Sequence, residues 1–139
     1  MSISVTIKGC DTIELSTECT RRVTYSTYPS LDDQAQPNDM CSTLTIVGSI
    51  LSKEEDATHS LNDWALTSAE EIDCYRQVNV TLTSGDRIVR NYFFPNAFVI
   101  SQMEDYGDGD ATFILVIKQK NDSIADIAIK GNTNEKRNI

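Results

Sequence analysis

Apolar residues recur at helical spacing in only one strong stretch of the chain, between residues 52 and 66. Ser52 and Glu55 are three residues apart, the spacing of a capping box, in which each side chain satisfies an open backbone donor of the first turn. The apolar residues that follow fall on one face of such a helix: Ala57, Leu61, Trp64 and Ala65. The pattern predicts one amphipathic helix at about residues 53–66.

Most of the remaining chain alternates apolar with polar residues, which is the period of a strand with one solvated face. Val78, Val80 and Leu82 are each followed by a polar residue. Gly48 suggests a bulge in its strand, and Pro95 is expected to interrupt another because it has no amide hydrogen for the ladder. The strands that we predict are residues 2–8, 12–16, 20–28, 40–51, 75–83, 87–94, 97–103, 111–118 and 123–129.

One of these strands is apolar on both faces. Phe113, Leu115 and Ile117 share one face, and Ile114 and Val116 share the other. Consecutive apolar residues at 88–89, 92–94 and 98–99 repeat the feature in earlier strands. A single helix can shield only one patch of sheet, so the second face must close on another sheet of the same chain or on another subunit.

Residues 29–39 lose all periodicity. They collect turn-forming and chain-breaking residues, namely Pro29, Ser30, Asp32, Asp33, Pro37, Asn38 and Asp39. The segment is long for a hairpin connection. It is either a solvated surface loop or an arm that contacts a neighbouring molecule.

The chain is acidic and has the size of one domain. Its 139 residues carry a formal charge of −9, from 21 acidic and 12 basic residues. This charge disfavours sequence-specific nucleic-acid binding and binding to anionic membranes. The first twenty residues lack the pattern of a signal peptide, and no stretch has the length of a membrane span. We expect a protein that is cytoplasmic as synthesised, with one domain at residues 1–130 and a flexible tail at 131–139.

Candidate chemistry is sparse. Four cysteines allow three disulfide pairings or four reduced thiols, and a zinc site would need all four to converge, because their spacing is irregular. They are Cys10, Cys19, Cys41 and Cys74. His59 is the sole histidine and falls on the polar side of the predicted helix, so we expect it to be solvated. The acidic run 105–110 lacks the spacing of a calcium loop and is better explained as a hairpin turn. The sequence gives no indication of an enzyme, a metal or a cofactor.

The order of elements from about residue 44 to residue 129 resembles the tube proteins of contractile injection machines, which include Hcp and phage tail-tube proteins. The resemblance covers a strand, the helix at 53–66, a strand at 75–83, an aromatic strand with a short break at 92–100, and a strand at 113–119. It implies a mainly β fold, a small β-barrel or two-sheet sandwich with one α-helix. The loop at 29–39 lies where that family has an extended loop that contacts the next ring.

The same resemblance implies a function and partners. A homo-oligomeric ring, most often a hexamer, would stack into a tube that meets sheath, spike or cargo proteins, either in a phage-like particle or as an injected tube. An acidic lumen would let anionic cargo pass, and shared sheets would bury the second apolar face between subunits. The candidate interface residues are Pro29, Leu31, Asp32, Asp33, Pro37 and Asp39 in the loop, and Phe93, Val99 and Val116 in the strands.

Two other classes of function stay open at this point. A monomeric β-sandwich or barrel could bind a small ligand or a protein partner in a cleft lined by aromatic residues, with Tyr25, Tyr28, Tyr75 and Tyr92 as candidates. An enzyme would need a pair of carboxylates in a pocket, such as Glu104 with Asp108.

Overall fold

The structure, a computed structural model, describes residues 1–29, 40–51, 55–67, 71, 74–119 and 128–134. These residues form eight strands and one helix, which confirms the predicted mainly β fold with a single helix. The elements are β1 (Ser2–Lys8), β2 (Thr12–Leu15), β3 (Thr20–Pro29), β4 (Met40–Ser49), α1 (Glu55–Ala65), β5 (Arg76–Ser84), β6 (Arg87–Gly107), β7 (Asp110–Gln119) and β8 (Ala128–Asn134).

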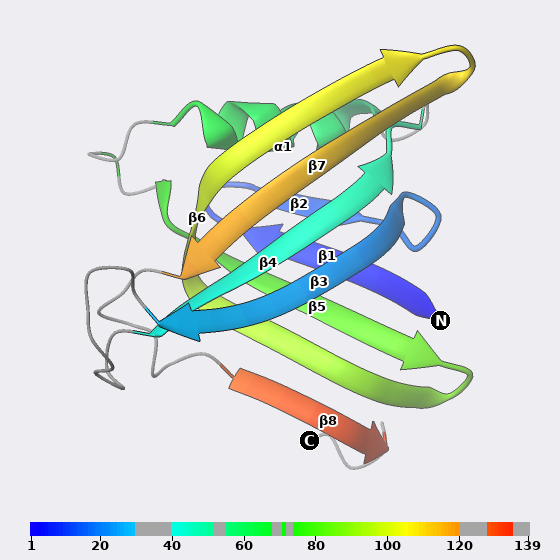
Figure 1. The fold of residues 1–139 in the computed structure, drawn as a ribbon, viewed down its shortest axis with the longest axis vertical. Coiled ribbons are helices and arrows are strands. Elements are labelled where there is room, and N and C mark those ends of the chain that lie inside the picture. The colour runs from blue at the N-terminus through cyan, green and yellow to red at the C-terminus, as the bar shows by residue number, and fades with distance from the viewer. Residues whose placement is uncertain (30–39, 52–54, 68–70, 72–73, 120–127, 135–139) are drawn as a thin grey trace.

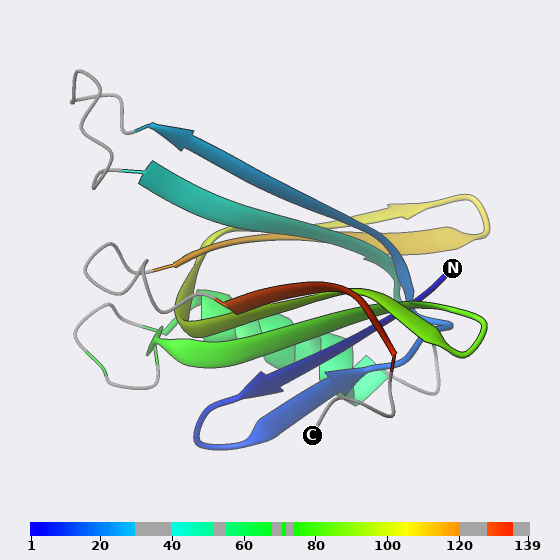
Figure 2. The ribbon, with the colours of Figure 1, turned by 90° about the horizontal axis from the view of Figure 1, so that it is seen from below.

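All eight strands belong to one antiparallel sheet in the order β2-β1-β5-β6-β7-β4-β3, and β8 pairs with β6. β6 belongs to both halves of this sheet, because residues 87–97 pair with β5 and residues 97–107 pair with β7. We call β2, β1, β5 and the first part of β6 the first half-sheet. The rest of β6 with β7, β4 and β3 is the second half-sheet. β6 curves from one to the other, so the two halves face each other as two layers (Figures 1 and 2).

The core fills the space between the two half-sheets. Cross-strand register places Val5, Val80 and Tyr92 in one inward-facing row of the first half-sheet. Leu44 and Ile117 pair in the second. The apolar side chains that are at least nine-tenths buried form one cluster: Ile3, Val5, Ile7, Ile13, Leu15, Cys19, Leu44, Ile46, Leu61, Trp64, Val78, Val80, Phe94, Ala97, Phe113, Leu115 and Ile117. Burial of this apolar surface is the main force that folds the chain.

The helix α1 packs against β2 and β6 and adds Leu61 and Trp64 to the core. Trp64 donates a hydrogen bond from Nε1 to the carbonyl oxygen of Cys74, at 2.8 Å. The guanidinium carbon of Arg76 lies 5.4 Å from the centre of the Trp64 ring, and its Nη1 lies 3.7 Å from Oδ1 of Asp11. The charge of the buried Arg76 is therefore held by an aromatic face and a carboxylate. The proposed Ser52 cap lies outside the described residues.

The predicted break at Pro95 is wrong, because β6 runs through it from Arg87 to Gly107. The pairing with β5 shifts register between Phe94 and Ala97, so no residue of β5 is opposite Pro95. A proline is tolerated there because the strand is passing from one partner to the other, where no ladder hydrogen bond is required. The backbone N–H of Asn96 donates instead to Oε1 of the fully buried Gln119, at 3.2 Å.

Gly48 lies beside a bulge, but the extra residue is in the partner strand. The register of β3 against β4 shifts between Thr20 and Arg22, opposite Gly48 and Val47. A Cβ atom on Gly48 would lie 2.5 Å from the carbonyl oxygen of Cys19 and 2.6 Å from the Phe113 ring. Glycine is required at this position because the Phe113 ring and the β2–β3 connection pack directly on its backbone.

The C-terminal strand ends later than the sequence predicts. β8 spans Ala128–Asn134 and pairs with residues 87–93 of β6. Residues 131–134 therefore belong to the sheet and not to a tail. Their polar sequence does not indicate a strand, but β6 pairs with them. Residues 123–127 of the predicted strand and 135–139 of the predicted tail lie outside the described residues. In the described part of the chain, Cys10, Cys19 and Cys74 are thiols and not members of a disulfide.

Candidate assembly surface

The second half-sheet has two edges without a strand partner among the described residues. β3 pairs only with β4, and residues 98–107 of β6 pair only with β7. Such edges present backbone N–H and C=O groups that can pair with another chain. The four strands alternate in direction across this half-sheet, so a copy added at either edge would continue the antiparallel pattern.

The outward face of the second half-sheet carries a group of apolar side chains among polar ones. Register places Met103, Ile114 and Val47 in one row across β6, β7 and β4. Ile114 and Val47 are half-buried, whereas Met103 is 54% exposed. Ile100 stands at the register shift between Val99 and Ser101 and is 48% exposed. This face therefore leaves in water a set of apolar side chains that a second copy could cover.

The two open edges carry opposite charges at the same end of their strands. Arg22 continues the row of Met103 at the β3 edge, and Arg21 precedes it. Glu104 follows Met103 in β6. Its carboxylate accepts hydrogen bonds from the hydroxyl of Tyr106 at 2.7 Å and from Nε2 of Gln102 at 3.1 Å. These bonds hold the acidic group of the β6 edge in a defined position.

The structure separates the three strand residues predicted at an interface. Phe93 faces outward from the first half-sheet opposite Asn79, and Val116 faces outward from the second opposite Thr45. Val99 is opposite the buried Ile117 and packs against the core, so it does not belong to an outer surface. The sequence could not show which of the two apolar faces of these strands points inward.

The predicted loop contacts are not described by the structure. Pro29 is the last residue of β3. The others lie outside the described residues, and their role stays a prediction: Leu31, Asp32, Asp33, Pro37 and Asp39.

The aromatic residues proposed for a ligand cleft pack elsewhere. Tyr25 and Tyr92 stack with ring centres 4.8 Å apart, and both pack against the core. The rings of Tyr75 and Phe98 pack edge to face, with their centres 5.9 Å apart. The side chain of Tyr28 lies outside the described part. Tyr25 and Tyr92 therefore support the interior of the protein and do not line a binding cleft.

The carboxylate pair that an enzyme would need is not brought together in a pocket: Glu104 lines a pocket with Ile50, Thr58, His59 and Tyr106, and Asp108 does not line it. The His59 side chain is 73% exposed, with Nδ1 at 3.5 Å from Oδ2 of Asp63 one helical turn later. Glu104 is occupied by its bonds to Tyr106 and Gln102. Within the described ranges, no three His, Cys, Asp or Glu side chains gather in a way that could hold a metal ion. The same ranges contain no helix with the length and hydropathy needed to cross a bilayer.

The hydrophobic pattern of the sequence does not identify Arg21, Arg22, Ile100 and Met103 as surface candidates. A pair of adjacent arginines at the start of a strand is conspicuous in an acidic chain and was the available signal. The exposure of Ile100 and Met103 had no such signal, since it depends on which face of a long strand is covered by the other half-sheet.

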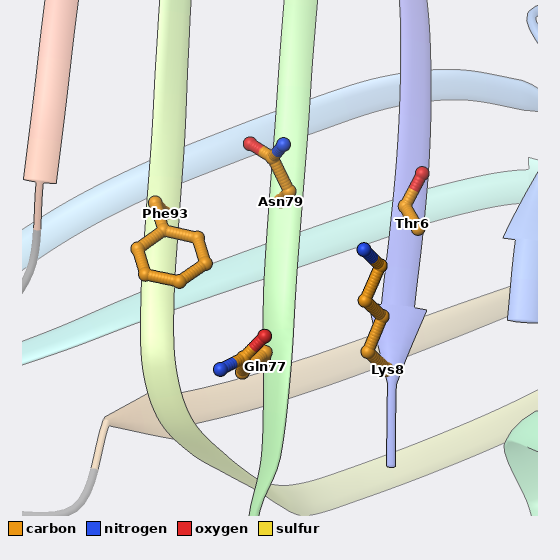
Figure 3. Close-up of a pocket in the computed structure, with 5 residues that line it drawn as sticks. All are labelled: Thr6, Lys8, Gln77, Asn79 and Phe93. Carbon is orange, nitrogen blue, oxygen red and sulfur yellow. The ribbon is translucent and has the colours of Figure 1, made fainter. Parts of the chain in front are cut away.

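A shallow hollow lies on the outward face of the first half-sheet (Figure 3). It has a volume of about 190 Å³ and is lined by Thr6, Lys8, Gln77, Asn79 and Phe93. Thr6, Asn79 and Phe93 share one row across β1, β5 and β6, and Lys8 pairs with Gln77 in the next row. The hollow is thus built on regular strands of the sheet.

The fold is similar over nearly its whole length to proteins of contractile machines. Hcp1 from Flavobacterium johnsoniae matches with a TM-score of 0.61 and 15% identity, over 95% of this chain and 97% of Hcp1. A chain of the PVC sheath–tube complex, an extracellular contractile injection system in its extended state, gives 0.54 and 14%, over 94% and 88%. A chain from the C6-symmetric tail of an empty GTA particle gives 0.51 and 10%, over 94% and 96%.

No model of a protein family and no curated protein matches the sequence. The identities to the solved structures are low, so the likeness is one of fold. The alignments cover 88% to 97% of those chains. This chain has the Hcp-like tube fold, the fold of Hcp1 and of tail-tube proteins of contractile injection systems.

Proposed function

We propose that this chain is a structural subunit that assembles side by side into rings, and that the rings stack as the tube of a phage-tail-like or type VI-like contractile injection apparatus. The fold supports this role, because its likeness to Hcp1 spans 95% of the chain. The observation that carries the proposal is the second half-sheet, with two edges of opposite charge that lack a strand partner among the described residues, and a group of apolar side chains on its outward face.

Ring assembly would add the β3 edge of one copy to residues 98–107 of β6 in the next. Copies related by rotation alone keep their rows approximately level, which brings Arg21 and Arg22 of one copy close to Glu104 and Asp105 of its neighbour. Backbone pairing would supply most of the contact, and the charges would select the correct edge. Because the two edges differ, the contact is head-to-tail, and a closed ring results when the rotation between copies closes.

The resemblance makes a hexamer the expected ring, with sheath, spike or cargo proteins as further partners. The tube would work as a channel and scaffold, without catalytic residues. The net charge of −9 suits both tasks, because an acidic wall repels anionic cargo and keeps unassembled subunits apart in solution. We place the assembled protein in a phage-like particle or injected tube, after synthesis in the cytoplasm.

Negative-stain microscopy with light scattering tests this proposal. Wild-type protein should show rings or tubes and a mass several times 15.5 kDa. Arg22→Glu should weaken assembly by about tenfold or more in concentration, because it places like charges at the shared edge. The double variant Arg22→Glu with Glu104→Arg restores opposite charges and should recover rings. A uniform species of 15.5 kDa at high concentration would overturn the proposal.

A further inference from the structure

The hollow on the first half-sheet exists because β6 turns away from β5 at its edge. Gln77 has no partner residue in β6, since the ladder shifts register between Phe94 and Ala97. The space that a side chain would fill there is open, and Phe93 forms one wall of it. In Figure 3 Phe93 lies on β6, Gln77 and Asn79 on β5, and Thr6 and Lys8 on β1, with all five side chains on the same face.

Polar groups around the hollow are available to a ligand, and they are mainly donors. Nδ2 of Asn91 donates to Oδ1 of Asn79 at 2.8 Å, which leaves the amide nitrogen of Asn79 as its open group. Within the described ranges, Lys8 forms no ion pair, even though Glu14 lies in the neighbouring row of β2. Lys8 and the amide of Gln77 add further donors, and the hydroxyl of Thr6 can also donate. The hollow is therefore a small basic and donor-rich site on a chain of charge −9.

This combination suits a carboxylate attached to an apolar or aromatic group. The carboxylate would accept hydrogen bonds from Lys8 and Asn79, and charge-assisted bonds of this kind are the strongest in proteins. The half-buried Phe93 ring offers a flat wall against which the apolar part can pack. An aspartate next to a tyrosine in a protruding turn has this chemistry.

The β6–β7 turn of the chain presents that chemistry at the other end of the molecule. Asp105, Tyr106, Asp108 and Asp110 are all exposed, and Tyr106 is 66% exposed. In Figures 1 and 2 this turn projects at the right, whereas the end of β1 that carries Lys8 lies toward the left. A contact between opposite ends of identical molecules repeats from copy to copy and builds a stack.

We propose that the acidic β6–β7 turn of one copy binds in the Lys8 hollow of a second copy, with a turn carboxylate on Lys8 and Asn79 and an aromatic contact between Tyr106 and Phe93. The inference rests on the proposed tube function and names one contact between successive rings. The hollow lies on the first half-sheet, whereas ring closure uses the edges of the second. The acidic turn adjoins residues 98–107 of the β6 edge, but Asp108 lies beyond that edge, so Lys8 and Asp108 test the axial contact apart from the lateral one.

Charge reversal tests the stacking contact without touching ring closure. Lys8→Glu should leave rings intact in micrographs but raise the protein concentration needed for stacks by about tenfold or more. Asp108→Lys should have the same effect, and the double variant should regain stacks, because the reversed charges again attract. Arg87→Glu, at the start of β6 beside the β5–β6 turn, makes the same change in net charge as Lys8→Glu and serves as its matched control, with unchanged stack length.

The outcomes separate this inference from the proposed function. Intact rings with shortened stacks in both single variants, restored in the double variant, support the contact. Unchanged stack length in Lys8→Glu overturns it and leaves the ring proposal standing, as does a double variant no better than either single one. Wild-type protein that forms no rings overturns the tube function, and with it the basis for any stacking contact.

Discussion

The two half-sheets have the same interior and different exteriors. Both direct aliphatic rows inward, represented by Val5 and Val80 in the first and Ile46 and Leu115 in the second. The outward face of the first presents Ser4, Thr6, Asn79 and Thr81, which are polar, and one aromatic residue, Phe93. The outward face of the second presents the apolar Val47, Ile114, Val116 and Met103 beside the polar Thr45, Ser101 and Lys118. The second exterior is thus the richer in aliphatic side chains, which is one reason that we propose a contact between copies there.

The edges of the halves differ in the same way. β8 covers residues 87–93 of β6 on the side opposite β5, and β2 at the far border of the first half-sheet packs near α1. Both borders of the second half-sheet lack a strand among the described residues. Edge strands left long and uncovered are an aggregation hazard unless a specific partner pairs with them. This contrast is the reason that the proposed ring contact is placed on the second half-sheet.

The largest expected effect is the difference in stability between a substitution on the inward face of β7 and one on its outward face. Leu115→Ala should lower the free energy of unfolding by about 2–5 kcal/mol, because it leaves a cavity in the core. Val116→Thr, one residue later on the outward face, should change it by less than about 1 kcal/mol. Urea unfolding at concentrations below assembly measures both variants. Equal losses would show that the two faces are not distinct in the isolated chain.

A smaller loss of folding stability is expected at Gly48, where side-chain and backbone atoms pack directly on the backbone of the second half-sheet. Gly48→Ala should cost about 1–3 kcal/mol, since the new methyl group would overlap the Cys19 carbonyl oxygen and the Phe113 ring. Gly107→Ala is the matched control, because no atom lies within 4 Å of the position that its Cβ would take. Thermal unfolding of the two variants checks the difference. A control as destabilised as Gly48→Ala would refute the packing explanation.

The smallest effect on stability is expected from charges placed on the two exteriors. Met103→Lys and Ser4→Lys both alter exposed side chains and should change the free energy of unfolding by about 0.5 kcal/mol or less. Met103→Lys should nevertheless weaken assembly by about tenfold or more, because it places a positive charge beside Arg22 of the neighbouring copy at the proposed shared edge, whereas Ser4→Lys should not. Sedimentation velocity at several concentrations compares them. Identical sedimentation of the two variants would mean that the two exteriors are equivalent.

Local pattern predicted most of the fold. Alternation in Val78, Val80 and Leu82, and the two-faced run from Phe113 to Ile117, identified strands that the structure confirms. The helix was placed within two residues of Glu55–Ala65 at each end by the spacing of Leu61 and Trp64. These predictions succeed because burial of one face of an element imposes the period of that element on the sequence.

Features that depend on distant pairing could not be predicted. Pro95 lies in a strand only because β6 changes partner there, and Gln119 is buried because it satisfies Asn96 at that bend. The proposed assembly surface has the same limit. Arg22 and Met103 lie in one row through β4 and β7, although they are 81 positions apart in the sequence. A single sequence shows which residues could form such a surface, but it does not show which of them lie opposite one another in paired strands.

Amide hydrogen exchange at two protein concentrations tests the central claim most directly. We consider the backbone amides of Thr20–Pro29 that point away from β4 and those of residues 98–107 that point away from β7. If copies join through the second half-sheet, these amides should exchange more slowly at high protein concentration. Amides of the first half-sheet, in β1 and β5, should not change through ring closure. Exchange at both edges that is independent of concentration, while particle mass increases, would contradict the account.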